Sequence, residues 1–195
     1  MVTNSILLLC SYCIGSIPTG LLLAKAFGGV DIRTQGSGNI GATNVYRTMG
    51  RKVGILTLIG DCLKGLLPVL AAKSLHLPAE WVALIGLAAF LGHIFPVFLR
   101  FKGGKGVATA LGVFLATSPL AVLGALCVFI TVLVSWRYVS LASLTAAAVM
   151  PLLITLIYRN PIFVAMSIVI SVTVLLKHHE NIKRLRNGTE NKFKA

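Results

Sequence analysis

Three short polar stretches interrupt a chain that is otherwise almost continuously apolar, and their residue types suit phosphate chemistry. The first loop, residues 36–44, reads Gly-Ser-Gly-Asn-Ile-Gly-Ala-Thr-Asn, and the second loop, residues 100–106, reads Arg-Phe-Lys-Gly-Gly-Lys-Gly. The third stretch, residues 177–190, opens a basic tail and contains two histidines. Glycines let backbone N–H groups approach an anion, basic side chains neutralise its charge, and histidine titrates near neutral pH. The three stretches therefore predict a site for a phosphorylated substrate.

The first loop has the glycine spacing of a dinucleotide-binding fingerprint without its context. Its glycines follow the pattern G-x-G-x-x-G at Gly36, Gly38 and Gly41. The fingerprint needs a preceding strand in a βαβ unit, and an all-helical membrane chain offers none. Backbone N–H groups beside Gly38 can still hold an anion. An ordinary glycine-rich connector between two membrane helices is the alternative.

A helix over residues 40–48 is expected to follow the first loop and to point its positive end at a phosphate. Ser37 or Asn39 would cap this helix. Thr43 and Asn44 lie about one turn before Arg47, so these polar side chains share a face. All five side chains are candidates for binding substrate.

The second loop resembles a phosphate-binding P-loop only at first sight. A P-loop has Ser or Thr after its lysine to hold Mg²⁺, whereas Gly106 follows Lys105. What is left is a nest of flexible backbone amides at the start of an apolar segment. A positive-inside anchor is the alternative, but it does not account for three glycines. The candidate binding residues here are Lys102, Gly103, Gly104, Lys105 and Gly106.

The third stretch supplies a candidate acid or base. If the preceding membrane helix continues into the tail, His178 and Asn181 flank its apolar stripe, while His179 and Glu180 point elsewhere. An imidazole and a carboxamide on the packed face suit a general base and its orienting partner, so His178 and Asn181 are the catalytic candidates. An interfacial basic helix on acidic lipid is the alternative.

The rest of the chain must position these stretches in a membrane. Hydrophobic residues make up 56% and charged residues 12% of the 195 residues, whereas about a quarter of the residues in soluble domains are charged. We therefore predict an all-α integral membrane protein, in which the first apolar run is a membrane helix and not a cleaved signal peptide. A span needs about 20 apolar residues. The candidate spans are residues 5–27, 53–72, 81–99, 107–118, 120–136, 139–158 and 162–176, of which the fourth is short.

The distribution of basic residues favours seven spans with the N-terminus outside and the C-terminus in the cytoplasm. Fifteen of the 18 lysines and arginines then lie on the cytoplasmic side, Lys73 and Arg159 lie outside, and Lys64 lies within the second span. A re-entrant fourth segment would change the split to nine inside and eight outside. The result is one membrane domain, residues 1–195, with polar cytoplasmic segments at 28–52, 100–106 and 177–195. The cytoplasmic residues are Lys25, Arg33, Arg47, Arg51, Lys52, Arg100, Lys102, Lys105, Arg137, Lys177, Lys183, Arg184, Arg186, Lys192 and Lys194.

Several polar residues inside the predicted spans are expected to be structural. Asp61 and Lys64 can pair across one helical turn, which lowers the cost of both charges in the bilayer. His93 is expected to be hydrogen-bonded within the packed helices. We expect no disulfide and no metal site, because the cysteines all fall in apolar runs without a matching ligand set. We also expect no cofactor. These cysteines are Cys10, Cys13, Cys62 and Cys127.

Three signatures, spread over the length of the chain, are similar to those of the bacterial PlsY family. They are the first loop with its continuation to Arg47, the segment Gly-His-Ile-Phe-Pro-Val-Phe-Leu-Arg-Phe-Lys-Gly-Gly-Lys-Gly-Val-Ala-Thr at residues 92–109, and Lys-His-His-Glu-Asn at residues 177–181. The order and number of spans match as well. We see no departure from the family pattern at the polar positions.

The resemblance implies an acyl-phosphate:glycerol-3-phosphate acyltransferase of the bacterial inner membrane, with its site on the cytoplasmic face. Its substrates would be glycerol 3-phosphate and a long-chain acyl phosphate, and its product would be 1-acylglycerol 3-phosphate. Membrane lipids would surround it, and no nucleic acid is expected as a partner. By analogy the working residues are Ser37, Arg47, Lys105 with its glycine loop, and His178 with Asn181. Ser37 thereby joins the catalytic candidates, and Glu180 is expected to be structural.

Two other classes of protein remain as alternatives. A small transporter or channel for phosphate-containing anions would share the anion loops, but the outer loops offer it little polar lining, and no inverted repeat is evident. A lipid-surface binding scaffold would account for the basic tail but not for the glycine loops. Anion flux into vesicles without chemical change would favour the transporter.

Overall fold

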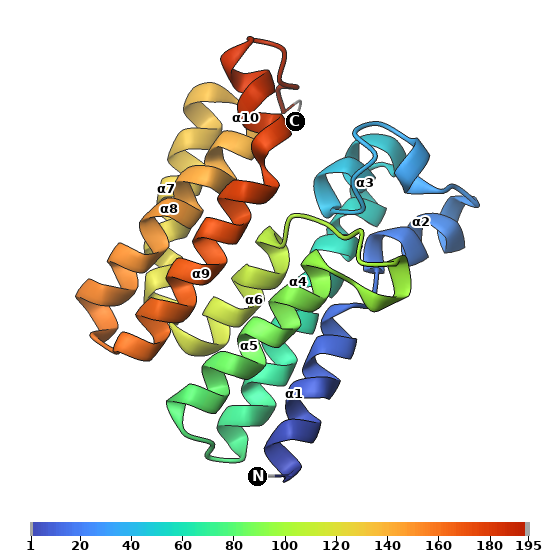
Figure 1. The fold of residues 1–195 in the computed structure, drawn as a ribbon. Coiled ribbons are helices and arrows are strands. Elements are labelled where there is room, and N and C mark those ends of the chain that lie inside the picture. The colour runs from blue at the N-terminus through green and yellow to red at the C-terminus, as the bar shows by residue number, and fades with distance from the viewer. Residues whose placement is uncertain (1, 194–195) are drawn as a thin grey trace. The chain divides into compact units, whose positions relative to one another are not determined.

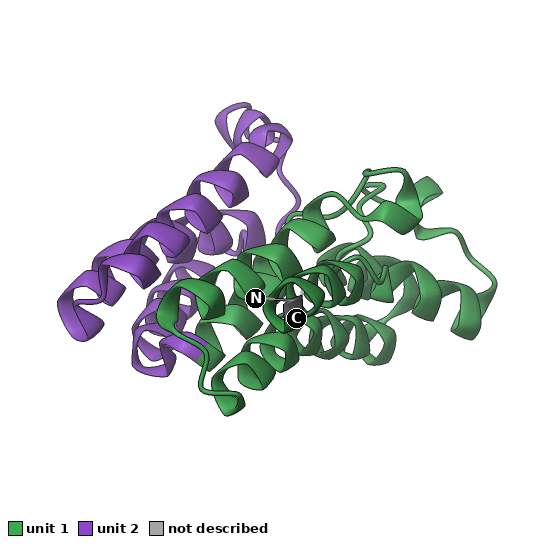
Figure 2. Cartoon of the chain, turned by 60° about the horizontal axis from the view of Figure 1, so that its bottom comes forward, with its two compact units in different colours: residues 1–116 green, residues 117–195 purple. Residues whose placement is uncertain are grey.

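The structure is a computed structural model that describes residues 2–193, and within that range every regular element is a helix (Figure 1). The prediction of an all-α membrane protein is confirmed. The chain divides into two compact units, residues 1–116 and residues 117–195 (Figure 2). Lys194, which the sequence assigns to the cytoplasmic tail, lies outside the described residues.

Unit 1 is built on two long apolar helices. The central helix, α4, packs against α5, and α1 packs against both; α2 and α3 also lie on α4. The short helix α6 approaches α4 closely, because a side chain at Gly112 would collide with the carbonyl oxygen of Cys62. The elements are α1 (Val2–Gly15), α2 (Thr19–Gly28), the 3-10 turn η1 (Ile32–Thr34), α3 (Ala42–Met49), α4 (Arg51–Ser74), α5 (Ala79–Ile94), the 3-10 turn η2 (Val97–Leu99) and α6 (Val107–Thr117).

The first predicted span, residues 5–27, is wrong as one continuous helix. The chain breaks between α1 and α2, and the two helices are bent by 41°. Pro18 is the cause, because it has no N–H to donate and disfavours helical backbone at the residue before it. Pro18 also precedes the first residue of α2 as its N-cap. The break leaves the carbonyl oxygen of Ile17 within reach of another part of unit 1, as described below.

Unit 2 consists of three apolar helices and a short polar one. α7 packs against α8, and α8 packs against α9. The side-chain oxygen of Asn160 caps α9 by accepting from the N–H groups of Ile162 at 3.0 Å and Phe163 at 3.3 Å. The elements are α7 (Pro119–Trp136), α8 (Val139–Tyr158), α9 (Pro161–Lys177) and α10 (His179–Arg186).

The helices agree with a membrane location. Among the described residues, four helices are long and apolar enough to cross a bilayer, and the number rises to six if each bent pair counts as one span. The four are α4, α5 together with η2, α7 and α8. Helix α6 is apolar but has only 11 residues, as expected for a short segment. Seven spans and their orientation stay predictions.

A small apolar cluster in unit 1 supports both glycine loops. It joins α2, η1, α3 and α4, and Leu99 of η2 packs against it. Ile40 lies within the first loop and Val45 directly follows it, while Leu99 directly precedes the second loop. The two loops are therefore anchored on one core. The buried members are Leu21, Ala24, Ile32, Ile40, Val45 and Val53.

Candidate functional site

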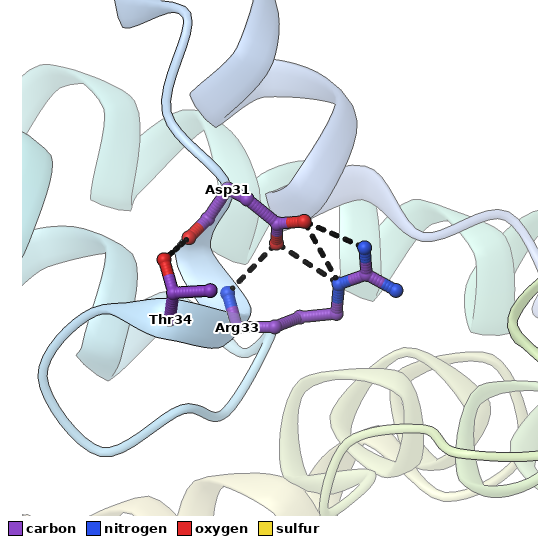
Figure 3. A network of polar contacts seen from close by, with 3 residues as sticks. All are labelled: Asp31, Arg33 and Thr34. Carbon is purple, nitrogen blue, oxygen red and sulfur yellow. Dashed lines mark hydrogen bonds and ion pairs between the residues drawn. The ribbon is translucent and has the colours of Figure 1, made fainter.

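An exposed ion pair fixes the chain just before the first loop (Figure 3). The Arg33 guanidinium donates from Nη2 to Oδ2 of Asp31 at 2.6 Å and from Nε to Oδ1 at 2.9 Å. Oδ1 also accepts the backbone N–H of Arg33 at 3.0 Å, and the hydroxyl of Thr34 donates to the Asp31 carbonyl. The hydrogen bonds from Arg33 hold the pKa of Asp31 well below its usual range. The entry to the loop thus keeps its compact shape at neutral pH.

Asn44 holds the first loop together from inside. Its side chain is buried, with the residue only 3% exposed. The amide nitrogen Nδ2 donates to the carbonyl oxygens of Asn39 at 2.9 Å, Gln35 at 3.0 Å and Ile32 at 3.3 Å. The oxygen Oδ1 accepts the backbone N–H of Ser37 at 2.9 Å. One carboxamide therefore sets the path of the backbone on both sides of the loop glycines.

The structure corrects the predicted start of the helix after the first loop. The helix α3 begins at Ala42, its N-cap is Gly41, and neither Ser37 nor Asn39 caps it. Instead the side chain of Asn39 accepts the N–H of Gly41 at 2.8 Å, which forms a local turn. Gly41 occupies the N-cap position with the extended backbone usual there and has no side chain with which to cap the helix. The first residues of α3 still carry N–H groups without helical partners.

The side chains expected to bind substrate differ in burial around the first loop. Ser37 and Arg47 are exposed, Thr43 is half-buried on α3, and Asn44 is buried. Gly38 has a positive φ of 69°, a backbone conformation that glycine adopts without strain. The exposed set suits direct contact with a ligand. Asn44, by contrast, shapes the loop.

We expect Asn44→Ala to weaken the use of a phosphate-bearing substrate, because the Ser37 N–H and three carbonyl groups would lose a buried partner. Each buried group left unpaired costs about 1–3 kcal/mol. The KM for glycerol 3-phosphate should rise by at least about tenfold, measured by steady-state acyl transfer. Gln35→Ala, which removes an exposed side chain next to the loop, is the matched control and should change KM little. Equal KM values in the two variants would contradict this role of Asn44.

The second loop is a tight turn that leads into the N-terminus of α6. Arg100 and Phe101 have left-handed backbone, with φ of 50° and 63°, and Gly106 has a φ of 82°. Lys102 is exposed, Lys105 is half-buried, and Gly104 is buried. The first N–H groups of α6 follow directly and have no helical acceptor, so this is a favourable place for an anion. That this loop binds an anion stays a prediction.

A buried polar group lies beneath the second loop. The expected pair of Asp61 and Lys64 is confirmed, with 2.8 Å between Nζ and Oδ1 and side chains at most 5% exposed. His93 is also buried, and its Nδ1 lies 3.7 Å from Oδ1 of Asp61. The backbone oxygen of His93 accepts the N–H of Gly104 at 3.1 Å. His93 is packed as predicted and contacts the second loop through its backbone, but its ring Nδ1 has no hydrogen-bond partner among the described residues, so the expected hydrogen bond of the ring is not seen.

In unit 2 the structure confirms which histidine faces inward. His178 and Asn181 are 3% and 5% exposed, whereas the side chains of His179 and Glu180 are 71% and 62% exposed. The expected continuation of α9 is wrong, since α9 ends at Lys177 and α10 is bent from it by 56°. His178 sits at the bend, and its Nδ1 lies 2.8 Å from the carbonyl oxygen of Val174. Because a carbonyl only accepts, Nδ1 carries the proton and Nε2 is the basic nitrogen.

Glu190 contacts the predicted site residue Asn181, and the sequence analysis did not identify it. Its carboxylate is buried at the end of the tail and accepts from the Asn181 amide and from the Ser140 hydroxyl, both at 2.8 Å. The guanidinium of Arg184 donates to it at 2.7 Å. The available signal was an acidic residue that follows a run of basic residues in the tail. Glu190 ties α10 to α8 and fixes the carboxamide of Asn181.

We expect acid to loosen this part of unit 2. Burial alone would raise the pKa of Glu190, but hydrogen bonds from Arg184, Asn181 and Ser140 outweigh burial and lower the pKa. A depressed folded-state pKa contributes stability above the unfolded value of 4.5, and that stability is lost as pH falls through the folded pKa. Thermal unfolding in detergent from pH 7 down to pH 3 should show this loss. The Glu190→Gln variant should lack that part of the pH dependence, and a slope identical to wild type would contradict the assignment.

The structure brings part of the predicted site together. Both loops lie in unit 1 on the shared apolar cluster, and His178 with Asn181 lies in unit 2. That all three stretches meet at one site stays a prediction. Among the described residues, no group of three His, Cys, Asp or Glu side chains is arranged to hold a metal ion.

Comparison with known proteins gives one consistent family. The model of the glycerol-3-phosphate acyltransferase family matches residues 5–188. The glycerol-3-phosphate acyltransferase of Geotalea daltonii is 66% identical over 194 residues and covers 100% of both chains. Two crystal structures of PlsY, an integral membrane glycerol 3-phosphate acyltransferase, are 44% and 43% identical, with TM-scores of 0.93 and 0.91. Each covers 98% of this chain and 96% of its own; one is the glycerol 3-phosphate form and the other the lysophosphatidic acid form. The chain therefore belongs to the glycerol-3-phosphate acyltransferase family, the PlsY family of integral membrane enzymes.

Proposed function

We propose that the enzyme moves a fatty acyl group from acyl phosphate to the sn-1 hydroxyl of glycerol 3-phosphate. The products are 1-acylglycerol 3-phosphate, which is lysophosphatidic acid, and inorganic phosphate, and the reaction serves phospholipid synthesis. The observation that carries the proposal is the likeness along nearly the whole chain to PlsY structures in a glycerol 3-phosphate form and a lysophosphatidic acid form. Two separate anion loops in unit 1 are consistent with two phosphate-bearing substrates.

The chemistry needs no covalent acyl-enzyme. The hydroxyl oxygen of glycerol 3-phosphate attacks the acyl carbonyl carbon, the bond from that carbon to the phosphate oxygen breaks, and phosphate leaves with the electron pair. The hydroxyl proton passes to Nε2 of His178, whose Nδ1–H is held by Val174. Asn181 is the partner that orients His178, and Glu190 holds the carboxamide of Asn181. A positioned base of this kind contributes about 10²- to 10⁴-fold.

The two loops act as clamps for the anionic substrates. The residues of the first loop and α3 hold one phosphate, with Arg47 as the neutralising charge and Ser37 as a hydroxyl at the reacting end. The second loop, with Lys102, Lys105 and the backbone of its glycines, holds the other. Holding both reactants in line contributes more than either charge, because effective molarities reach about 10⁵ M and above.

The proposed topology places this chemistry at the cytoplasmic face of the bacterial inner membrane. It has seven spans, with the N-terminus outside, α6 as the short fourth span and the C-terminus in the cytoplasm. The positive-inside distribution supports it, as do four clear spans and two bent helix pairs. The acyl donor then arrives from the bilayer, and glycerol 3-phosphate from the cytoplasm.

The deciding experiment supplies purified enzyme with a long-chain acyl phosphate, with and without glycerol 3-phosphate, and with acyl-CoA as the alternative donor. We expect phosphate release that depends on glycerol 3-phosphate and equals the lysophosphatidic acid formed. Equal product from acyl-CoA would overturn the assignment of the donor. If folded protein forms no product from either donor, the acyltransferase proposal is wrong, and vesicle flux becomes the next measurement.

A further inference from the structure

The buried ion pair of α4 is costly for a membrane helix and calls for a reason. Asp61 and Lys64 are 2% and 5% exposed and lie in the middle of a 24-residue apolar helix. Replacing a buried ion pair by apolar residues is often neutral or stabilising in proteins, so the pair by itself is weak support for the fold. Ionisable residues within membrane helices more often mark function.

The pair contacts two other parts of unit 1, the break between α1 and α2 and the ring of His93. Lys64 is anchored at one end, because Nζ donates at 2.9 Å to the carbonyl oxygen of Ile17, at the break between α1 and α2. Its partner Asp61 lies 3.7 Å from Nδ1 of His93. That distance exceeds a hydrogen bond, and Nδ1 has no hydrogen-bond partner among the described residues, so the Asp61 carboxylate borders the ring by contact alone. One side of the His93 ring therefore faces α4.

The other side of the ring is the second loop. A Cβ atom at Gly104 would collide with Nε2 of His93, and a Cβ atom at Gly103 would collide with the carbonyl oxygen of His93. The same carbonyl accepts the N–H of Gly104 at 3.1 Å. His93 thus forms the floor of the loop with both its backbone and its ring.

We infer that Asp61, held in place by Lys64, positions the ring of His93 and through it the backbone of residues 103–105, so that the buried ion pair sets the shape of a phosphate-binding loop. The inference rests on the proposed role of the second loop in holding a phosphate. His93, Asp61 and Lys64 are positioning residues, since none of them is placed against substrate. A shift of the loop by about 1 Å can cost 10²-fold in rate when it misaligns a reactant.

The test separates shape from stability with a charge-neutral double variant, Asp61→Asn with Lys64→Met. Removing both charges avoids leaving one buried charge alone, so the Tm in detergent should stay within a few degrees of wild type. The measurement is the rise in Tm caused by inorganic phosphate, which reports binding without catalysis. If the pair had a merely structural role, this rise would be unchanged in the double variant. We expect wild type to be stabilised by phosphate and the double variant to lose that rise. The KM for one of the two substrates should increase about tenfold, with a smaller change in kcat.

The controls keep the inference separable from the proposed function. Thr57→Val alters a buried residue of α4 whose hydroxyl donates only to the Val53 carbonyl of its own helix, and it should keep the phosphate response. If the double variant does not fold, His93→Gln replaces it and should show the same loss. A folded variant of either kind with the wild-type phosphate response overturns the inference. A different pair of results would separate the two ideas: the wild-type protein transfers no acyl group, but phosphate raises its Tm and does not raise that of the double variant. In that case the inference stands and the proposed function fails.

Discussion

Replacing His178 by alanine should lower kcat by about 10²- to 10⁴-fold, the range expected for a positioned general base. His178 is buried at the bend between α9 and α10, and the Val174 carbonyl fixes its tautomer so that Nε2 is the basic nitrogen. The adjacent His179 has a side chain that is 71% exposed and lies beside Glu180. His179→Ala is the matched control, because it removes the same chemical group one position away.

The measurement is steady-state phosphate release with saturating acyl phosphate and glycerol 3-phosphate, on protein whose Tm is within a few degrees of wild type. His178→Ala should lose activity and His179→Ala should keep most of it. Equal losses, or a greater loss from His179→Ala, would mean that the buried histidine at the bend is not the base. A loss below about tenfold in His178→Ala would instead assign the proton to a substrate phosphate oxygen.

The apolar helices could be predicted from sequence because each depends on its own composition. Runs of about 20 apolar residues need no distant partner to become helices in a bilayer. The prediction for residues 139–158 matches α8 at both ends, and the short segment at 107–118 is a short helix, α6. The two bends were missed for different reasons. Pro18 was a readable signal, whereas the bend at His178 has no proline or glycine at the bend itself to announce it.

The sequence predicted which side chains of the tail point inward, even though α10 is bent from α9. His178 is the N-cap of α10 and Asn181 lies in its first turn, so their spacing of three sets how they face whatever the angle of α10 to α9. The residues that shape the loops could not be predicted in the same way. Asn44 reaches back to carbonyl groups up to twelve positions earlier, and Glu190 reaches Ser140 from fifty positions away. Such contacts depend on tertiary packing, which local patterns of polarity do not encode.

The same limit applies to Gly104, whose importance appears only once the ring of His93 is placed beneath it. Gly104→Ala should reduce kcat/KM by about 10²-fold, because a Cβ atom there would collide with Nε2 of His93 and push residues 103–105 from their position. The backbone at Gly104 is not left-handed, so the collision accounts for the effect without added strain. The control is Gly124→Ala in α7, where the three atoms nearest to the added Cβ all belong to the flexible side chain of Leu153, the closest at 3.1 Å. Steady-state acyl transfer measures both variants, and Gly124→Ala should be nearly silent.

A double variant tests whether the collision is the cause. His93→Ala removes the ring and should itself lower activity, because the loop loses its floor. If the collision carries the cost of Gly104→Ala, adding that change to His93→Ala should cost little more, since the atom that it strikes is gone. Independent causes would instead multiply the two losses. If the activity loss of the double variant equals the product of the two single losses, contact between Gly104 and His93 does not cause the effect of Gly104→Ala. If the loss is well below that product, the shape of the second loop depends on the His93 ring, which α5 holds beneath it.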